Sequence, residues 1–435
     1  MTEREMIEKI LNQELLYATG CTEPAAISYC ASIAAKELRE LGDDIDRIEV
    51  YASKNILKNA MAAGLPNSKY VGVNYAAGIG ALHGNPENKL NVNNDVDSET
   101  YDKVTKMINE DRIKTMLAKV VNVLYIDVII YGKNNTVEVV IADEHTKVVL
   151  IKINDKTKFK LESDNNDNNK IQPEEIASYL TIKRIYDFCT SKDYDPINNP
   201  IAIIKKSEEV NTIISEAGLK EEYGLSVGKG IMEDIITGNR ENNVINRAIM
   251  YATAGSDARM VGAPYAVVTN SGSGNQGITI TMAVISVAND LKVSDEIKYR
   301  ALTIAHLCSI RIKSKFGTLS AFCGAAIASI GAACGVTYLY GGDYDALVRT
   351  ISNMVGTVAG MICDGAKPDC SLKIYAGLSA ALESVTLSLN NKRVDKTEGI
   401  VCEDVEDTIN NICDMSKCCS SALDDRILDY MLNKK

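Results

Sequence analysis

Two cysteines flank a turn in the segment Met361-Ile362-Cys363-Asp364-Gly365-Ala366-Lys367-Pro368-Asp369-Cys370-Ser371-Leu372-Lys373. The residues just before the cysteines, 354–362, are mostly small and apolar, which is typical of the end of a buried helix. After the turn, Ser371 can cap a second helix that carries apolar residues such as Leu378 and Leu382. The segment therefore predicts a loop with two thiols between two helix ends. Such a loop is suited to binding a metal or an iron–sulfur cluster.

A third cysteine has a similar position upstream of this loop. Cys323 precedes Gly324 at the start of a long apolar segment, so it is also expected near the end of a helix. The six residues between Cys363 and Cys370 match neither the short spacing of zinc ribbons nor the ferredoxin pattern. From spacing alone, the three thiols are either metal ligands or structural cysteines.

The whole sequence predicts an α+β fold in two domains. A chain of 435 residues exceeds the length, about 250–300 residues, at which single cores tend to split. Residues 1–172 are expected to form a smaller N-terminal α+β domain. Residues 173–435 have an almost entirely helical pattern and are expected to form a large helical domain.

Within the N-terminal domain, the capping box Thr2-x-x-Glu5 predicts a first helix. Residues rich in Val and Ile predict a strand and then a three-stranded antiparallel meander, at Ile48–Ala52, Leu124–Tyr131, Thr136–Ala142 and Lys147–Ile153. Helical periodicity is present over Tyr101–Val121. The polar run Glu162–Lys170 is expected to be an exposed loop.

Cys21 is a candidate reactive thiol. Thr22-Glu23-Pro24 is a helix start signal, so Cys21 lies just before a helix N-terminus. The positive end of a helix dipole favours a thiolate, and we therefore expect a depressed pKa for Cys21. The alternative is a buried, inert cysteine.

A glycine-rich loop, Asn270-Ser271-Gly272-Ser273-Gly274-Asn275-Gln276-Gly277, precedes an apolar helix. Such a loop exposes backbone N–H groups that can bind a carboxylate or phosphate. The Lys followed by Ser or Thr of a phosphate loop is missing, so a small carboxylate is the better prediction, with a plain tight turn as the alternative. Asn59 lies in a polar segment that either lines a pocket or forms a surface helix, and His145 is expected to be solvated in a turn.

Composition limits the possible partners. The formal net charge of −11 argues against nucleic acid or an anionic membrane surface. Residues 1–10 are charged and lack the apolar region of a signal peptide, and 12 cysteines without an export signal indicate a reducing cytoplasm. Ser320–Leu339 has no charge, but its Gly, Ala and Ser content favours a buried helix of a soluble core over a membrane span.

Four motifs together resemble the L-cysteine desulfidase family, which is related to the alpha domain of iron–sulfur L-serine dehydratases. They are Gly20-Cys21-Thr22-Glu23-Pro24, Ser271-Gly272-Ser273-Gly274-Asn275-Gln276-Gly277, Ser320-Ala321-Phe322-Cys323-Gly324-Ala325-Ala326 and Cys363-Asp364-Gly365-Ala366-Lys367-Pro368-Asp369-Cys370. The resemblance covers nearly the whole chain. It implies a carbon–sulfur lyase with an oxygen-sensitive [4Fe–4S] cluster, which converts L-cysteine and water into hydrogen sulfide, ammonia and pyruvate.

By the same resemblance, Cys323, Cys363 and Cys370 would be the three cluster ligands, and Cys21 would accept a proton from the substrate. A fourth iron without a protein thiolate would be an open Lewis-acid position for the substrate sulfur, and no pyridoxal phosphate would be required. The candidate substrate-binding residues are Ser271, Ser273, Asn275 and Asn59.

Two other functions are compatible with these residues. The same cluster chemistry would act on L-serine or another β-substituted amino acid. A non-catalytic cluster or zinc protein that senses redox state is less favoured, because a structural zinc site needs a fourth ligand. We further expect a cytoplasmic homo-oligomer whose partner is the small molecule L-cysteine, with no nucleic-acid or membrane partner.

Overall fold

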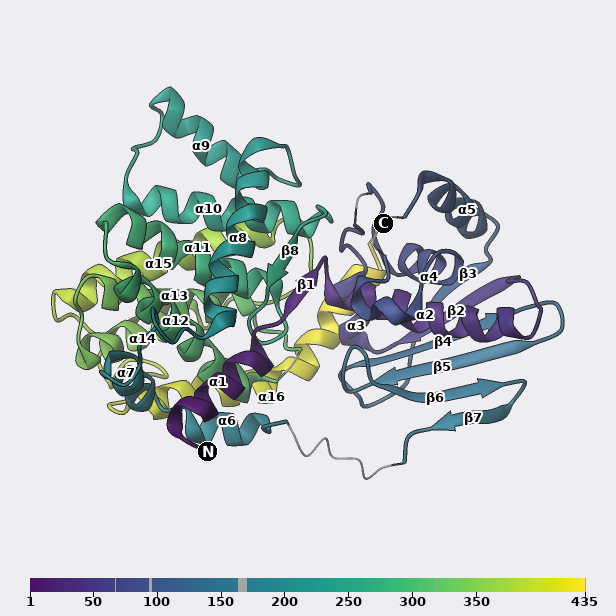
Figure 1. Cartoon of the computed structure of the whole chain (residues 1–435), viewed down its shortest axis with the longest axis horizontal. Coiled ribbons are helices and arrows are strands. Elements are labelled where there is room, and N and C mark those ends of the chain that lie inside the picture. Colours follow the sequence, from purple (N-terminus) through teal and green to yellow (C-terminus); the bar gives the residue numbers. More distant parts are fainter. Residues whose placement is uncertain (67, 94–95, 163–169, 318, 435) are drawn as a thin grey trace.

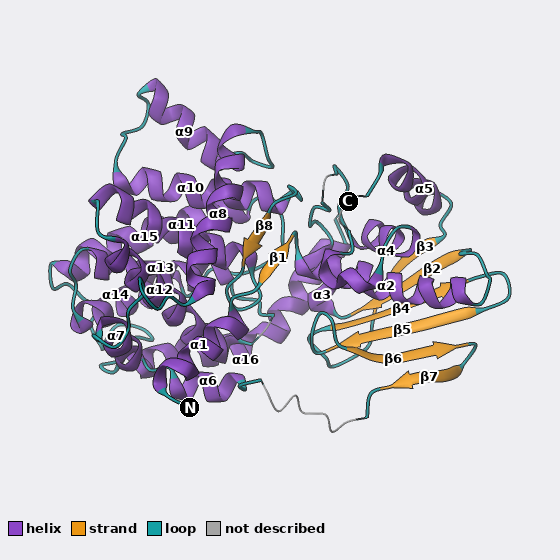
Figure 2. Ribbon diagram, in the orientation of Figure 1, coloured by secondary structure: helices purple, strands orange, loops and turns teal. Residues whose placement is uncertain are grey.

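The computed structural model describes residues 1–66, 68–93, 96–162, 170–317 and 319–434. It has a large helical part and a smaller part built on a six-stranded sheet, which lie side by side (Figures 1 and 2). The N-terminus lies in the helical part, and the C-terminus lies beside the sheet part (Figure 1). The predicted α+β fold is therefore confirmed.

The sheet part contains the predicted antiparallel meander. The strand order is β3-β2-β4-β5-β6-β7. The strands are β2 (Arg47–Ala52), β3 (Ile113–Leu117), β4 (Tyr125–Tyr131), β5 (Thr136–Ala142), β6 (Val148–Ile153) and β7 (Lys156–Lys160). The helices of this part are α2 (Thr22–Glu40), α3 (Lys54–Ala60), α4 (Val73–Leu82), the 3₁₀ helix Pro86–Asn91 and α5 (Ser98–Asn109). Helix α2 packs on β4, β5 and α4, so the sheet's core side chains are buried against it.

The helix expected over Tyr101–Val121 is wrong in its second half. Helix α5 ends at Asn109, and Asp111 adopts a left-handed conformation with φ of +58°. The chain then forms β3, which pairs in parallel with β2, with Ile113 beside Ile48. Backbone hydrogen bonds to β2 thus outweigh the local helical periodicity. The predicted loop Glu162–Lys170 lies largely outside the described residues, since 163–169 are not described.

The helical part surrounds one long hydrophobic core. Its helices are α1 (Glu3–Glu14), α6 (Pro173–Tyr179), α7 (Ile182–Thr190), α8 (Ala202–Lys220), α9 (Val227–Thr237), α10 (Val244–Met260), α11 (Gly274–Leu291), α12 (Asp295–Phe316), α13 (Gly324–Leu339), α14 (Tyr344–Val358), α15 (Cys370–Leu389) and α16 (Val405–Leu432). Two short strands, β1 (Tyr17–Thr19) and β8 (Ala266–Val268), pair antiparallel in the same part.

From Gly324 onward, the uncharged segment Ser320–Leu339 forms α13, which packs against α11, α12 and α15. Its small residues allow this close packing. A Cβ atom at Gly331 would lie 2.5 Å from the Ala305 carbonyl oxygen, and one at Gly335 would lie 2.7 Å from that of Ala301. Among the described residues, no helix combines the length and apolarity needed to cross a bilayer.

Both ends of the chain cross between the two parts. Helix α1 has the predicted capping box, but its buried residues belong to the core of the helical part. Near the end of α16, Leu428 lies in the core of the sheet part. Helix α1 thus belongs to the core of the helical part although it precedes residue 172, and α16 extends from that core to the core of the sheet part. The division into two domains at residue 172 stays a prediction.

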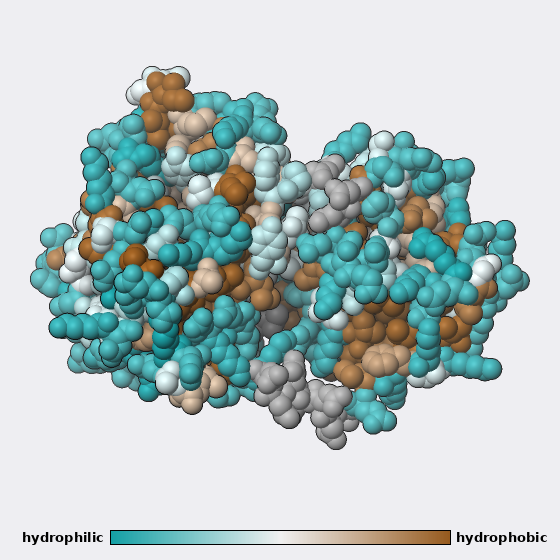
Figure 3. Space-filling view, viewed as in Figure 1, coloured by the Kyte–Doolittle hydropathy of each residue, from teal (hydrophilic) through white to brown (hydrophobic). Residues whose placement is uncertain are grey.

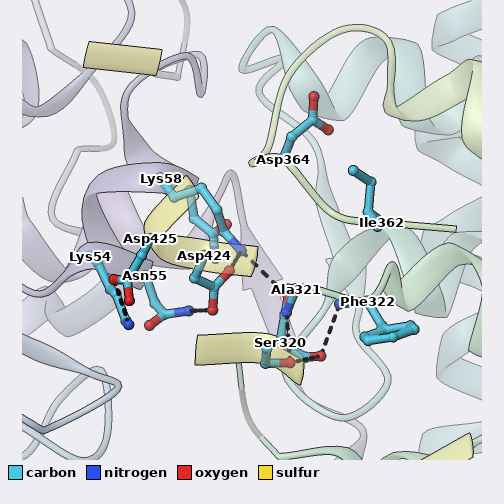
Figure 4. A network of polar contacts seen from close by, with 12 residues as sticks. Lys54, Asn55, Lys58, Ser320, Ala321, Phe322, Ile362, Asp364, Asp424 and Asp425 are labelled. Carbon is cyan, nitrogen blue, oxygen red and sulfur yellow. Dashed lines mark hydrogen bonds and ion pairs between the residues drawn. The ribbon is translucent and has the colours of Figure 1, made fainter. Parts of the chain in front are cut away.

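A buried ion pair joins the two parts where α16 reaches α3 (Figure 4). The Lys58 Nζ donates to Asp424 Oδ1 at 2.5 Å, and both side chains are almost fully buried. The Asn55 amide donates to the other carboxylate oxygen at 2.7 Å. Lys58 also approaches the Ser320 carbonyl oxygen at 3.5 Å, at the start of the segment that contains Cys323. This network fixes α3 and α16 beside that segment.

We expect Asp424→Ala to lower the free energy of unfolding by about 3–5 kcal/mol, because Lys58 would remain as a buried charge without its partner. The double variant Lys58→Met with Asp424→Leu should be less destabilised than the sum of the single variants. Urea denaturation followed by circular dichroism measures both. Lys54→Ala is the matched control, since it breaks the more exposed Lys54–Asp425 pair and should change stability by at most about 1 kcal/mol. Equal effects of Asp424→Ala and Lys54→Ala would contradict the role of the buried pair.

Candidate active site

One cavity, where the helical and sheet parts meet, contains all eight of the predicted site residues in its wall. They are Cys21, Asn59, Ser271, Ser273, Asn275, Cys323, Cys363 and Cys370. These residues come from the N-cap of α2, from α3, from the loop before α11 and its first turn, from the N-cap of α13, and from the loop before α15 and its first residue. Figure 3 shows a notch between the two parts on the face drawn there. The fold therefore brings together residues that are far apart in the sequence, and their roles stay predictions.

A backbone bridge aligns two of the three clustered cysteines. Phe322 and Ile362 form an antiparallel bridge, in which Cys323 N donates to Met361 O at 2.8 Å and Cys363 N to Ala321 O at 2.7 Å. The two cysteines each lie one residue from the bridged pair, in the diagonal positions of the ladder. Side chains in these positions lie on the same face, so the two thiols are on one side of the bridge.

The third cysteine follows a glycine that the local packing requires. Cys370 begins α15, and its Sγ lies 3.7 Å from the Gly365 carbonyl oxygen. Gly365 has a φ of +104°, and a Cβ atom there would lie 2.2 Å from the Lys58 carbonyl oxygen. The loop between Cys363 and Cys370 can therefore pass α3 only with glycine at this position.

The three thiols line one cavity but do not form a ready metal site. In the described part of the chain, no group of three or more His, Cys, Asp or Glu side chains is placed to hold a metal ion. Iron–sulfur clusters are held by thiolates, so what fits such a cluster here is the chemistry of the three side chains and not their placement. Lys373 lies close enough to Cys323 and Cys363 to interact with both electrostatically, and the buried Lys313 does so with Cys363. Both cations would stabilise thiolates.

Burial keeps two of these thiols protonated in the absence of a bound metal. It raises the pKa of Cys323 to about 11 and that of Cys370 to about 12. A coordinating metal deprotonates a thiol outright, so binding of a cluster would release these protons. The raised pKa values thus argue against free nucleophiles, and buried structural thiols would show the same shift.

The expectation of a depressed pKa for Cys21 is wrong. Cys21 is the N-cap residue of α2, as predicted, but its side chain makes no capping hydrogen bond and is 4% exposed. Burial raises the pKa of the Cys21 thiol, while the nearby Arg259 guanidinium lowers it and the Glu23 carboxylate raises it. The loss of hydration raises the pKa more than the N-terminus of α2 lowers it, because burial destabilises the charged thiolate.

The glycine-rich loop before α11 is held firmly. Ser271 and Gly272 both have positive φ angles, +48° and +78°, and Ser271 N donates to Glu14 O at 2.8 Å. Ser273 caps α11, since its Oγ accepts from Gln276 N at 3.4 Å. The loop therefore presents the N-terminus of an 18-residue helix at the cavity, where an anion would be favoured.

The chain matches the model of the serine dehydratase alpha chain family over residues 87–429. It belongs to this family. A UPF0597 protein of Oleidesulfovibrio alaskensis is 39% identical over 426 residues, which cover 98% of this chain and 97% of the relative. UPF0597 proteins of Clostridium perfringens and Fusobacterium nucleatum are 38% and 37% identical, and each match covers 99% of both chains. The serine dehydratase alpha chain family is associated with iron–sulfur clusters and lyase chemistry, so the resemblance inferred from the motifs is confirmed at that level.

In this member of the serine dehydratase alpha chain family, sequence reasoning missed several cavity residues. Arg259, Glu23, His145 and Lys313 all line the cavity. His145 was expected to be solvated, but its Nε2 is buried without a hydrogen-bond partner among the described residues, and burial lowers its pKa. Glu23 lies within the Cys21 motif and is the one residue that its sequence position could have identified. The others enter the cavity only through tertiary packing.

The pKa of Cys21 can be measured by alkylation with iodoacetamide, followed by peptide mass spectrometry over a range of pH. Because only the thiolate reacts and burial raises the pKa, half-maximal labelling of Cys21 should occur at a higher pH than that of a small-molecule thiol such as glutathione. The midpoint depends on ionisation, whereas poor access slows labelling at every pH. A midpoint for Cys21 below that of the small-molecule thiol would contradict the burial argument.

Proposed function

We propose that this protein is an L-cysteine desulfidase, a carbon–sulfur lyase that forms hydrogen sulfide, ammonia and pyruvate from L-cysteine and water. The observation that supports this proposal most is the shared cavity, in which Cys21 lies with Cys323, Cys363 and Cys370. A candidate base and three thiol ligands in one cavity are what an eliminating iron–sulfur enzyme needs.

Cys323, Cys363 and Cys370 would hold a [4Fe–4S] cluster. When bound, such a cluster supplies an iron without a protein ligand, which acts as a Lewis acid on the thiol of the substrate. The chain itself supplies the three thiolates and the nearby Lys313 and Lys373, whose positive charges favour the anionic cluster. The Phe322–Ile362 bridge fixes the spacing of two ligands, so that the cavity is formed before substrate binds.

The proposed chemistry is a β-elimination. The Cys21 thiolate takes the proton from Cα of L-cysteine, the electron pair forms the Cα–Cβ double bond, and the Cβ–S bond breaks to release sulfide. The product, aminoacrylate, tautomerises to the imine and is hydrolysed by one water to pyruvate and ammonia. Arg259 beside Cys21 stabilises the thiolate that this step requires.

A second candidate function is dehydration of L-serine. The family match is to the serine dehydratase alpha chain, which favours a hydroxyl leaving group. The same residues would hold the substrate and remove the Cα proton, and only the bond broken at Cβ would differ. Pyruvate formed from equal concentrations of L-cysteine and L-serine under anaerobic conditions distinguishes the two. The desulfidase proposal expects the larger kcat/KM for L-cysteine.

The cluster assignment predicts a brown protein that contains about four irons per chain after anaerobic purification, by the cluster type proposed. Cys363→Ala should lose most of this iron, its visible absorbance and its sulfide release. Iron analysis and the visible spectrum are the measurements. Cys418→Ala is the matched control, since Cys418 is exposed and outside the cavity, and it should keep all three. An iron-free wild-type protein with full activity would contradict the proposal.

The base assignment predicts a different result for Cys21→Ala. This variant should keep its iron and visible spectrum but lose about 10²–10⁴-fold in kcat, the usual contribution of a general base. The combination of normal iron content and lost turnover separates a base from a ligand. If Cys21→Ala also loses its iron, Cys21 binds the metal and the assignment fails. Iron without turnover in the wild type would instead favour a redox-sensing protein.

A further inference from the structure

Buried polar atoms without hydrogen-bond partners gather at the cavity. Four of those found among the described residues belong to its wall: Asn59 Oδ1, His145 Nε2, Arg259 Nε and Gln276 Oε1. Buried polar groups are nearly always hydrogen-bonded, and an unpartnered one is costly. Four in one cavity indicate a site that is completed by a polar ligand. The group contains both acceptors and a donor, so this ligand must carry both as well.

The donor belongs to a buried cation without an anionic partner. Arg259 is 6% exposed and makes no ion pair with a carboxylate in the described part of the chain. Its Nη2 donates to the Gly20 carbonyl oxygen at 3.1 Å, and its Nη1 lies 3.4 Å from Asn275 Oδ1. A Cβ atom at Gly274 would lie 2.2 Å from Arg259 Nε, so the guanidinium is packed against the first residue of α11. A guanidinium and a helix N-terminus thus meet at one place, and both favour an anion.

A second pair of polar side chains, Glu23 and Asn59, offers acceptor oxygens in the cavity wall. Glu23 Oε1 accepts from Asn59 Nδ2 at 3.1 Å, and Oε2 accepts from Thr22 Oγ1 at 3.1 Å. Glu23 has no ion pair with a Lys or Arg side chain among the residues described. Because the Asn59 amide donates to Glu23, its Oδ1 is left as a free acceptor. A carboxylate and an amide oxygen together are suited to an ammonium group.

We infer that Arg259 binds the carboxylate and Glu23, with Asn59, binds the ammonium group of an α-amino-acid substrate. This inference rests on the proposed function and adds the residues that select its substrate class. The two charges of an amino acid are attached to the same Cα. Arg259 bonds to the carbonyl before Cys21, and Arg259 and Glu23 both lie close enough to the Cys21 thiol to act on it electrostatically, so a ligand held by both would have its Cα near Cys21. The site therefore accepts α-amino acids and excludes simple acids and amines.

The test measures binding without turnover, by isothermal titration of the anaerobically purified holoprotein with three ligands. L-Alanine has both charges and no leaving group, L-alaninamide lacks the carboxylate, and propionate lacks the ammonium group. L-Alanine should bind at least about tenfold more tightly than either of the other two ligands, because the free energy of one charged hydrogen bond corresponds to about a tenfold change in Kd. Failure of L-alanine to bind, or equal binding of all three, overturns the inference.

Variants of Arg259 and Glu23 test which residue binds the carboxylate and which binds the ammonium group. Arg259→Gln should weaken L-alanine binding at least about tenfold and leave L-alaninamide unchanged, and Arg259→Lys should restore part of the loss. Glu23→Gln should weaken L-alanine and leave propionate unchanged. A merely structural role would weaken every ligand equally, and that result overturns the inference. Arg112→Gln and Glu241→Gln are matched controls outside the cavity, and they should bind all three ligands as the wild type does.

Failure of this inference and failure of the proposed function give different results. If the wild type releases sulfide from L-cysteine but both variants bind L-alanine normally, the charge assignment is wrong and the desulfidase stands. If L-alanine binding depends on both charges but neither L-cysteine nor L-serine is consumed, the amino-acid site stands and the reaction is wrong.

Discussion

The contact between α3 and the two cysteine segments is the constraint on which the site depends. The buried Lys58 ion-pairs with Asp424 of α16 and approaches the Ser320 carbonyl oxygen, while its own carbonyl oxygen leaves no room for a side chain at residue 365. One residue of the sheet part therefore lies against the segments that precede α13 and α15. Figure 4 shows Lys58 beside Ser320 and Ala321. These segments contain Cys323 and Cys363, and Cys370 begins α15. Because Lys58 lies in α3 and Asp424 lies near the end of α16, this contact joins two residues that are far apart in the sequence.

Charge inside the cavity follows a consistent pattern. The thiols lie near Lys313 and Lys373, and Cys21 lies near Arg259. Lys373 is also ion-paired with Asp364, whereas Arg259 has no carboxylate partner among the described residues. The positive charges near the thiols would favour their thiolate forms, and the charge of Arg259 would favour an anionic group of a ligand.

The sequence predicted the elements whose signals are local. The capping box at Thr2, the meander and the glycine-rich loop all appear as expected, because each depends on neighbouring residues. The strand β3 was missed because its partner, β2, lies far away in the sequence. For the same reason the motifs identified the thiols and the loop, but not Arg259 or His145. Neither residue has a signal in its neighbours, and each reaches the cavity through the packing of α10 or the turn after β5.

The error about Cys21 has a physical cause that depends on the whole fold. A helix N-terminus can be read from sequence, whereas the loss of hydration that raises the pKa of Cys21 depends on the whole fold. Arg259 and Glu23 act on this thiol in opposite directions. A simple carboxylate bound at Arg259 would cancel the favourable charge and raise the pKa of Cys21 further, whereas a simple amine at Glu23 would lower it without placing a Cα beside the thiol. An amino acid bound as proposed would neutralise both charges together, so its two effects on the pKa of Cys21 would oppose each other. The proposed substrate would therefore change the pKa of Cys21 less than a simple acid or a simple amine would.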